Sequence, residues 1–148
     1  VSCTYAIGRI EPDFFEKGKN GRFFRIPVYG NTKLALLLFT QELAKRIQDK
    51  GITINASDPG IVSTNMITMQ AWFDPLTDIL FRPFIKTPAQ GAATAIHLAL
   101  SNEAKDKNGC CYANCKKRNV SERIRHHTQQ KQLWDDTEIL LRQKGIRF

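Results

Sequence analysis

The sequence lacks any run of about 18 or more apolar residues, and no charged segment followed by an apolar one opens it. These residues therefore predict neither a membrane-spanning helix nor a signal peptide. Cysteines are few, and they lack the Cys-x-x-Cys spacing of structural zinc. Four cysteines are also too few for a disulfide scaffold. We expect no metal site and reduced, structural cysteines at Cys3, Cys110, Cys111 and Cys115.

What is present is an ordinary globular composition, 42% hydrophobic and 24% charged. The formal net charge is +8, from 22 Lys and Arg against 14 Asp and Glu. No zinc finger, helix-turn-helix or aromatic-interleaved basic motif accompanies this charge, so we expect a solvated basic face and no nucleic-acid partner. Binding to an anionic membrane surface or to nucleic acid is the alternative. The excess of positive charge is concentrated near the C-terminus, in Lys105, Lys107, Lys116, Lys117, Arg118, Arg123 and Arg125.

A long helix is predicted from Tyr29 to Lys50, after a polar loop over residues 9–28. Gly51 follows the helix as a stop signal. Leucines and other apolar residues cover more than one side of its first half, which indicates burial on two sides. One side would face the core, and the other could form a subunit interface. We therefore expect a homo-oligomer through the Tyr29–Lys50 helix.

The remaining pattern alternates strands and helices, which predicts an α/β fold with a parallel sheet and helices on both faces. Three parallel strands alone would leave a sheet edge and a face uncovered. We therefore expect one partial domain over 1–148, the C-terminal half of a doubly wound, Rossmann-like sheet, with the cofactor-binding half before Val1. The expected segments are a strand ending near Tyr5, a strand over 52–56 stopped by Asp58-Pro59-Gly60, a capped helix over 87–101, a strand over 109–114 and a helix from Ser121 through Trp134.

Tyr29 and Lys33 are four residues apart, so a helix places both side chains on one face. A phenol is a poor base at neutral pH, and an ammonium held nearby favours the phenolate form. The pair can therefore serve as a general acid/base. The spacing alone is common by chance, and a Tyr at a helix start with a surface Lys is the plain alternative.

The surrounding residues extend this pattern over nearly the whole chain. Tyr29-Gly30-Asn31-Thr32-Lys33 is followed by Ile52-Thr53-Ile54-Asn55 and by Asp58-Pro59-Gly60-Ile61-Val62-Ser63-Thr64. Gly109, Tyr112, Cys115, Val120-Ser121 and Leu133-Trp134 come in the same order and spacing. The sequence resembles the short-chain dehydrogenases/reductases, in particular their retinol-dehydrogenase-like branch.

The resemblance implies a role for each matching residue. Tyr29 would donate or accept the proton, and Lys33 would favour its phenolate and bond the nicotinamide ribose. Pro59, Gly60, Val62 and Thr64 would contact the nicotinamide, which makes them cofactor-binding residues together with Tyr29 and Lys33. The family also uses a Ser beside the substrate oxygen, and here Ser2 is the preferred match because a hydroxyl donates better than a thiol. Cys3 and Thr4 remain alternatives.

The resemblance also implies an NAD(P)-dependent oxidoreductase that interconverts an alcohol and a carbonyl. NADP is slightly favoured over NAD, and the family's Gly-rich turn is expected before Val1. The apolar stretch 66–86 matches the substrate lid and suits a retinoid, steroid or polyprenol-like alcohol, although core or dimer packing would explain it equally. The alternatives to an enzyme are an incompetent fragment that keeps the signature and a basic surface-binding module. Localisation stays open between cytoplasmic and membrane-associated, the latter through residues before Val1.

Overall fold

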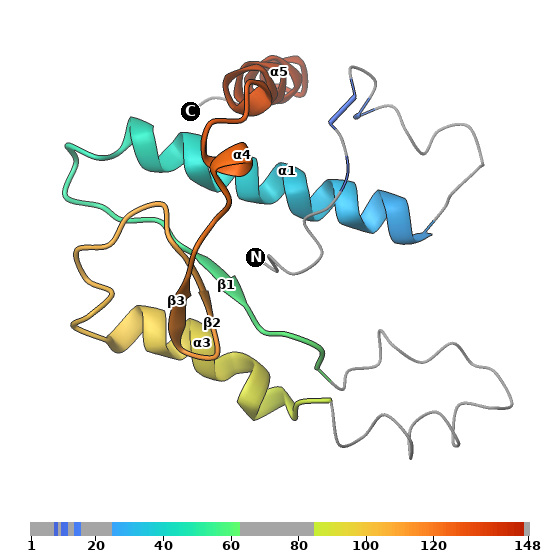
Figure 1. The fold of residues 1–148 in the computed structure, drawn as a ribbon. Helices are drawn as coiled ribbons and strands as arrows, with labels where there is room; N and C mark the ends of the chain where they lie inside the picture. Colours follow the sequence, from blue (N-terminus) through green and yellow to red (C-terminus); the bar gives the residue numbers. More distant parts are fainter. Residues whose placement is uncertain (1–7, 9, 12–13, 16–24, 63–84, 147–148) are drawn as a thin grey trace, which may run out of the picture.

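The computed structural model describes residues 8, 10–11, 14–15, 25–62 and 85–146. No helix among them has the length and hydropathy to cross a membrane. Figure 1 shows the elements in chain order, with the labels used below. They are α1 (Arg25–Arg46), β1 (Ala56–Asp58), α3 (Pro88–Leu100), β2 (Cys111–Ala113), β3 (Lys116–Arg118), α4 (Glu122–Arg125) and α5 (Gln129–Gln143).

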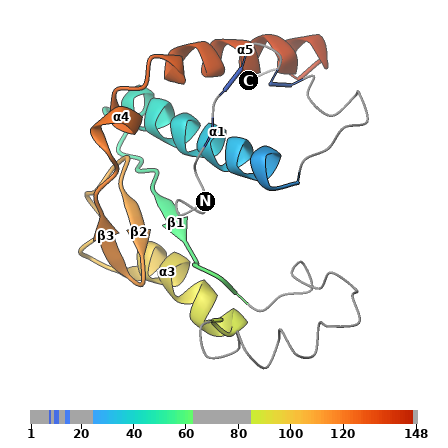
Figure 2. The ribbon, with the colours of Figure 1, turned by 45° about the vertical axis from the view of Figure 1, so that its right-hand side comes forward.

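The described strands form one mixed sheet in the order β1-β2-β3. β1 and β2 are parallel, with Ala56 opposite Cys111, as the α/β pattern predicts. β2 and β3 are antiparallel, so the expectation of an all-parallel sheet is wrong at this edge. The helices α1 and α3 lie on opposite faces of the sheet (Figures 1 and 2). The fold is therefore a partial α/β, Rossmann-like one. The strand expected at Val1–Tyr5 lies outside the described residues.

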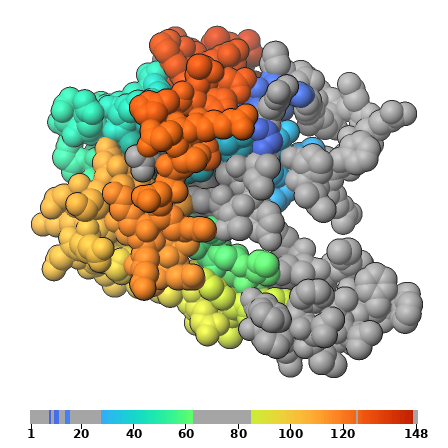
Figure 3. All heavy atoms as spheres, viewed as in Figure 1, coloured from blue at the N-terminus to red at the C-terminus, as the bar shows by residue number. Residues whose placement is uncertain are grey.

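Helix α1 is buried on two sides, as its apolar pattern predicts. Leu37 packs with Ala56 in the sheet, whereas Leu34 and Leu38 pack with Leu133 of α5. Burying each of these leucines contributes about 1.5–3 kcal/mol. The space-filling view shows the atoms of α4 and α5, in orange and red, lying against those of α1 (Figure 3). Helix α1 is thus the central layer between the sheet and α5.

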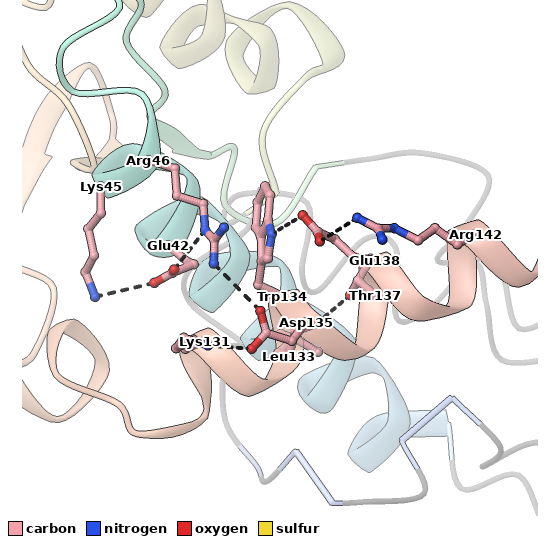
Figure 4. A network of polar contacts seen from close by, with 10 residues as sticks. All are labelled: Glu42, Lys45, Arg46, Lys131, Leu133, Trp134, Asp135, Thr137, Glu138 and Arg142. Atoms are coloured by element: carbon pink, nitrogen blue, oxygen red, sulfur yellow. Dashed lines mark hydrogen bonds and ion pairs between the residues drawn. The ribbon is translucent and has the colours of Figure 1, made fainter. Parts of the chain in front are cut away.

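The contact between α1 and α5 ends in a band of polar and aromatic side chains (Figure 4). The Trp134 ring stacks on Phe39 with ring centroids 4.8 Å apart, and the Arg46 guanidinium lies 4.5 Å from the Trp134 centroid. The same guanidinium pairs with Glu42 at 2.9 Å. Part of the helix expected at a subunit interface is therefore covered by α5 of the same chain. Leu36, 42% exposed, lies on its uncovered part.

The bounds of α1 differ from the prediction at both ends. The helix begins at Arg25, within the segment predicted as loop. Pro27 is compatible with this start because the N–H groups of a helix's first turn have no acceptor within the helix. Regular helix ends at Arg46, and a turn continues through Lys50 to Gly51, whose φ is 66°. The helix therefore ends four residues before the predicted Lys50, and Gly51, although left-handed, closes this turn instead of the helix.

The first described strand begins later than predicted, at Ala56 instead of residue 52. Side-chain amides bond this segment together with the backbone just before the strand, where the Gly109 N–H donates to the Ile54 carbonyl at 2.8 Å. The Ile54 N–H donates to Asn108 Oδ1 at 3.0 Å, and the Cys110 N–H donates to Asn55 Oδ1 at 2.9 Å. The two amides thus satisfy backbone N–H groups of both segments just before the regular strand begins.

The C-terminal region holds two features that the prediction missed. β2 turns into β3 through Asn114 and Cys115, whose φ angles of 53° and 58° are those of a two-residue hairpin turn. The expected last helix is divided into α4 and α5. His127 separates them, and its Nδ1 accepts the Gln129 N–H at 3.2 Å. A side chain thus supplies an acceptor at the start of α5, where the helix itself has none.

Helix α3 is confirmed nearly as predicted. Thr87 caps its start, with the Gln90 N–H donating to Thr87 Oγ1 and the Thr87 N–H donating to Gln90 Oε1. This reciprocal pair is the capping box indicated by Thr87-Pro88-Ala89-Gln90, with Pro88 at the first helical position. The helix ends at Leu100, one residue before the predicted end.

Candidate active site

The site lies on the side of the molecule where β1 ends. Figures 1 and 2 show the carboxyl end of β1 and the amino ends of α1 and α3 facing the same side. Open α/β sheets bind ligands outside the carboxyl ends of their strands. The predicted residues Tyr29 and Lys33 are in the first turns of α1, and Pro59 and Gly60 directly follow β1. The two sets of predicted residues therefore share one edge of the fold.

Tyr29 and Lys33 lie against each other on the surface of α1. The Lys33 Nζ is 5.1 Å from the centroid of the Tyr29 ring. Tyr29 is 40% exposed and Lys33 is half-buried, so the phenol is open to a small molecule while the ammonium is partly shielded. Thr32 donates its hydroxyl to the Tyr29 carbonyl at 2.8 Å. The arrangement therefore places the Lys33 ammonium over the face of the Tyr29 ring, a cation–π contact.

The turn after β1 is built by a buried carboxylate. Asp58 is 1% exposed, and its Oδ1 accepts the Gly60 N–H at 3.0 Å. Its Oδ2 lies 3.8 Å from Arg118 Nη1 on β3. Gly60 has a φ of 75°, a left-handed conformation that a side chain would strain. The Asp58-Pro59-Gly60 stop is therefore a defined turn, and Asp58 shapes its backbone.

Lys86 also lies at this edge, and no sequence pattern pointed to it. Its Nζ donates to the Pro59 carbonyl at 3.0 Å and to Asn114 Oδ1 at 2.5 Å. Its backbone pairs with Val62 in an isolated parallel bridge. These partners are 24 to 28 residues away in the chain, so no local pattern could have indicated them.

An open cavity of about 440 Å³ lies beside Lys86. It is bordered by the first turns of α3 and by the β2–β3 turn, and it has both polar and apolar walls. Lys86, which lines the cavity, also donates to the Pro59 carbonyl, so the cavity lies at the same edge. The lining residues are Ile85, Lys86, Gln90, Ala93, Thr94, Asn114 and Cys115.

Several predicted site residues cannot be placed. Ser2, with its alternatives Cys3 and Thr4, lies outside the described residues, and so does Thr64. The apolar stretch 66–86 lies outside them except for Ile85 and Lys86.

The cysteines correct one expectation. Cys111 is disulfide-bonded, so it is not the reduced residue that was predicted. Cys110 and Cys115 are free. Sequence spacing indicates which cysteines could bind a metal together but not which distant pair meets in the fold. In the part of the chain that the structure describes, no three His, Cys, Asp or Glu side chains gather as a metal site.

Comparison with known proteins adds to this geometry. The family model described as short chain dehydrogenase matches residues 17–72, a segment that contains Tyr29, Lys33, Pro59 and Gly60. Mouse retinol dehydrogenase 12 is 38% identical over 99% of this chain and 45% of its own length. The chain belongs to the short chain dehydrogenase family. Within that family it is similar to the retinol dehydrogenases.

Other members of the family agree with this assignment. Human retinol dehydrogenase 14 is 35% identical over 76% of this chain and 34% of its own length. The WW domain-containing oxidoreductase of Drosophila melanogaster is 33% identical over 81% of this chain and 29% of its own length. No solved structure matches the chain. The chain thus spans less than half the length of these short chain dehydrogenase relatives.

Proposed function

We propose that the protein is an NAD(P)-dependent oxidoreductase that interconverts an alcohol and a carbonyl, with Tyr29 as its general acid/base. The observation that carries this proposal is the contact between Lys33 Nζ and the Tyr29 ring at the ligand-binding edge of the sheet. Tyr29 and Lys33 belong to the first turns of α1, whose amino end faces the same side as the carboxyl end of β1 (Figures 1 and 2). Membership of the short chain dehydrogenase family supports the same reaction class.

The chemical step needs one proton acceptor and one hydride acceptor. In the oxidising direction, the phenolate oxygen of Tyr29 takes the proton of the substrate hydroxyl while the carbinol carbon loses its hydride. The C–O single bond then becomes a carbonyl. In the reducing direction, Tyr29 returns the proton to the oxygen. The nearby Lys33 ammonium stabilises the negative charge on the phenolate, and general acid/base catalysis of this kind supplies about 10²–10⁴-fold in rate.

The residues present fit the nicotinamide end of a cofactor. Lys33 offers ammonium donors, Tyr29 a hydroxyl, and the Pro59–Gly60 turn presents backbone without a bulky side chain at Gly60. When bound, a nicotinamide supplies or accepts the hydride. The pyrophosphate-binding turn of the family is proposed to lie before Val1, which is supported by the 45% coverage of retinol dehydrogenase 12. NADP is proposed over NAD because of this similarity.

The substrate is proposed to be an apolar alcohol or its carbonyl, such as a retinoid, a steroid or a polyprenol-like compound. The names of the relatives and the apolar composition of residues 66–86 support this class. A homo-oligomer through α1 stays a prediction, for which the exposed Leu36 provides limited apolar surface. Membrane association through residues before Val1 also stays a prediction.

The test is a cofactor and substrate survey of the full-length protein whose chain contains these residues. NAD and NADP are titrated by fluorescence, and turnover is followed by nicotinamide absorbance with retinoid, steroid and polyprenol alcohols and with a short polar alcohol. We expect saturable binding of one cofactor and faster turnover of an apolar alcohol. Failure to bind either cofactor would indicate the incompetent protein considered above. Salt-sensitive binding to DNA or anionic vesicles without turnover would instead indicate a basic binding module.

A further inference from the structure

Lys86 joins three segments that are distant in the chain. Its backbone N–H donates to the Ile61 carbonyl at 2.9 Å, and Val62 and Lys86 form a parallel bridge. The chain leaving β1 and the chain entering α3 therefore run side by side at this point. The side chain of Lys86 then reaches the β2–β3 turn, where it donates to Asn114 Oδ1 at 2.5 Å.

The third partner of Lys86 is the turn proposed to contact the nicotinamide. Its Nζ donates to the Pro59 carbonyl at 3.0 Å, and a charged donor makes a stronger bond than a neutral one. In the described part of the chain both acceptors of Lys86 are neutral oxygens. Hydrogen bonds to these two neutral oxygens, and not an ion pair with a carboxylate, therefore position the Lys86 ammonium.

The end of the Lys86 side chain lies next to Gly60. A Cβ at Gly60 would lie 3.3 Å from Lys86 Nζ, which is slightly tight, and 3.5 Å from its Cε, which is an ordinary contact. The lysine side chain therefore passes over the glycine and restrains the peptide between Pro59 and Gly60. Without this bond the turn would keep the Gly60–Asp58 bond but lose its second restraint, and glycine is the residue with the most conformations to lose on ordering.

We propose that Lys86 is a positioning residue for cofactor binding, which holds the Pro59–Gly60 turn in the conformation that receives the nicotinamide. This proposal rests on the proposed function. Lys86 acts through the backbone and takes no part in proton transfer. Ordering the turn before binding lowers the entropy that binding must remove, so the effect is on cofactor affinity.

The experiment compares Lys86→Met with the wild-type full-length protein. Methionine keeps much of the apolar stem but cannot donate to either oxygen. We expect the Kd and KM for the cofactor to rise about tenfold or more, the loss typical of a charged hydrogen bond, with kcat within about twofold. Lys86→Arg, which restores a charged donor, should recover most of the affinity. The matched control is Lys50→Met, an exposed lysine in the turn after α1, which should leave both constants unchanged.

A second variant separates positioning from folding. Asn114→Gly removes one acceptor of Lys86 while tolerating the left-handed φ of 53° at this position. We expect it to raise the cofactor Kd by about threefold with little change in the melting temperature. If Lys86→Met fails to fold, an unchanged Kd in Asn114→Gly overturns the proposal.

The outcomes distinguish this proposal from the proposed function. If the wild-type protein binds neither NAD nor NADP, the proposed function fails and the role of Lys86 falls with it. If the wild-type protein binds a cofactor but folded Lys86→Met binds it within twofold of wild type, only the role of Lys86 is overturned. A fall in kcat equal to the rise in KM would also contradict a role confined to positioning.

Discussion

Gly91 lies where α3 approaches the turn beyond β1, and a methyl group there should destabilise the fold. A Cβ at Gly91 would lie 2.6 Å from Val62 Cγ2 and 3.1 Å from Val62 Cγ1. Relaxed carbon contacts are about 3.5–4.0 Å, so the overlap is close to 1 Å. Val62 cannot easily turn away because its branched side chain has few χ1 rotamers and its backbone is bridged to Lys86.

The size of the effect follows from two opposing terms. Replacing Gly by Ala within a helix normally stabilises it by up to about 1 kcal/mol. Overpacking a close contact costs about 1–3 kcal/mol, and the distances place Gly91→Ala toward the upper part of that range. We therefore expect a net loss of about 1–2 kcal/mol in the free energy of unfolding, measured by urea titration with an unchanged m-value.

Two matched variants test the cause. Ala92→Gly, at the next and exposed position of α3, measures the helix propensity term alone. Val62→Ala removes the methyl groups that clash, so the double variant Val62→Ala/Gly91→Ala should be more stable than the sum of the single effects by about 1–2 kcal/mol. The reasoning is refuted if Gly91→Ala raises stability by the amount that Ala92→Gly lowers it.

Two further predictions concern the core. Trp134→Ala should lower the free energy of unfolding by about 2–4 kcal/mol. Trp134→Phe should lower it by less, because phenylalanine keeps the stack on Phe39 but loses part of the contact with Arg46. If thermal melting shows the same loss of stability for both variants, the stack on Phe39 is contradicted. Burial, and then the charges of Cys110 and Glu103, raise the pKa of Tyr112 above 10.0. The folded state therefore holds this proton more tightly than the unfolded state. The stability that neutral Tyr112 contributes is present below pH 10 and is lost as pH rises further. Tyr112→Phe should therefore lose less stability than the wild-type protein as pH rises above 10. An unchanged dependence of the free energy of unfolding on pH would refute the assignment.

Local signals in the sequence predicted local structure well. The Thr87 and Gln90 pair marked the start of α3 because both partners of a capping box lie within four residues. The four-residue spacing of Tyr29 and Lys33 correctly placed their side chains together, since one helix carries both. Their catalytic roles stay predictions.

Long-range contacts could not be predicted in this way. Just before β1, the Ile54 N–H donates to Asn108, which lies 54 residues away in the chain. The β2–β3 hairpin was missed because its turn pairs Asn114 with Cys115 in place of the usual glycine. The role of Lys86 depends on chains brought together only by the sheet. Each of these features is specified by tertiary packing, which overrides local preference.

The Tyr29→Phe variant of the full-length protein tests the central claim most directly. Phenylalanine keeps the ring beside Lys33 and removes only the hydroxyl, so cofactor affinity should stay within a few-fold of wild type. Turnover with the best apolar alcohol should fall by about 10²–10⁴-fold, the contribution of a general acid/base. Tyr112→Phe, a buried tyrosine on β2, is the control and should keep its turnover at neutral pH. Turnover of Tyr29→Phe equal to that of the wild-type protein would contradict the account.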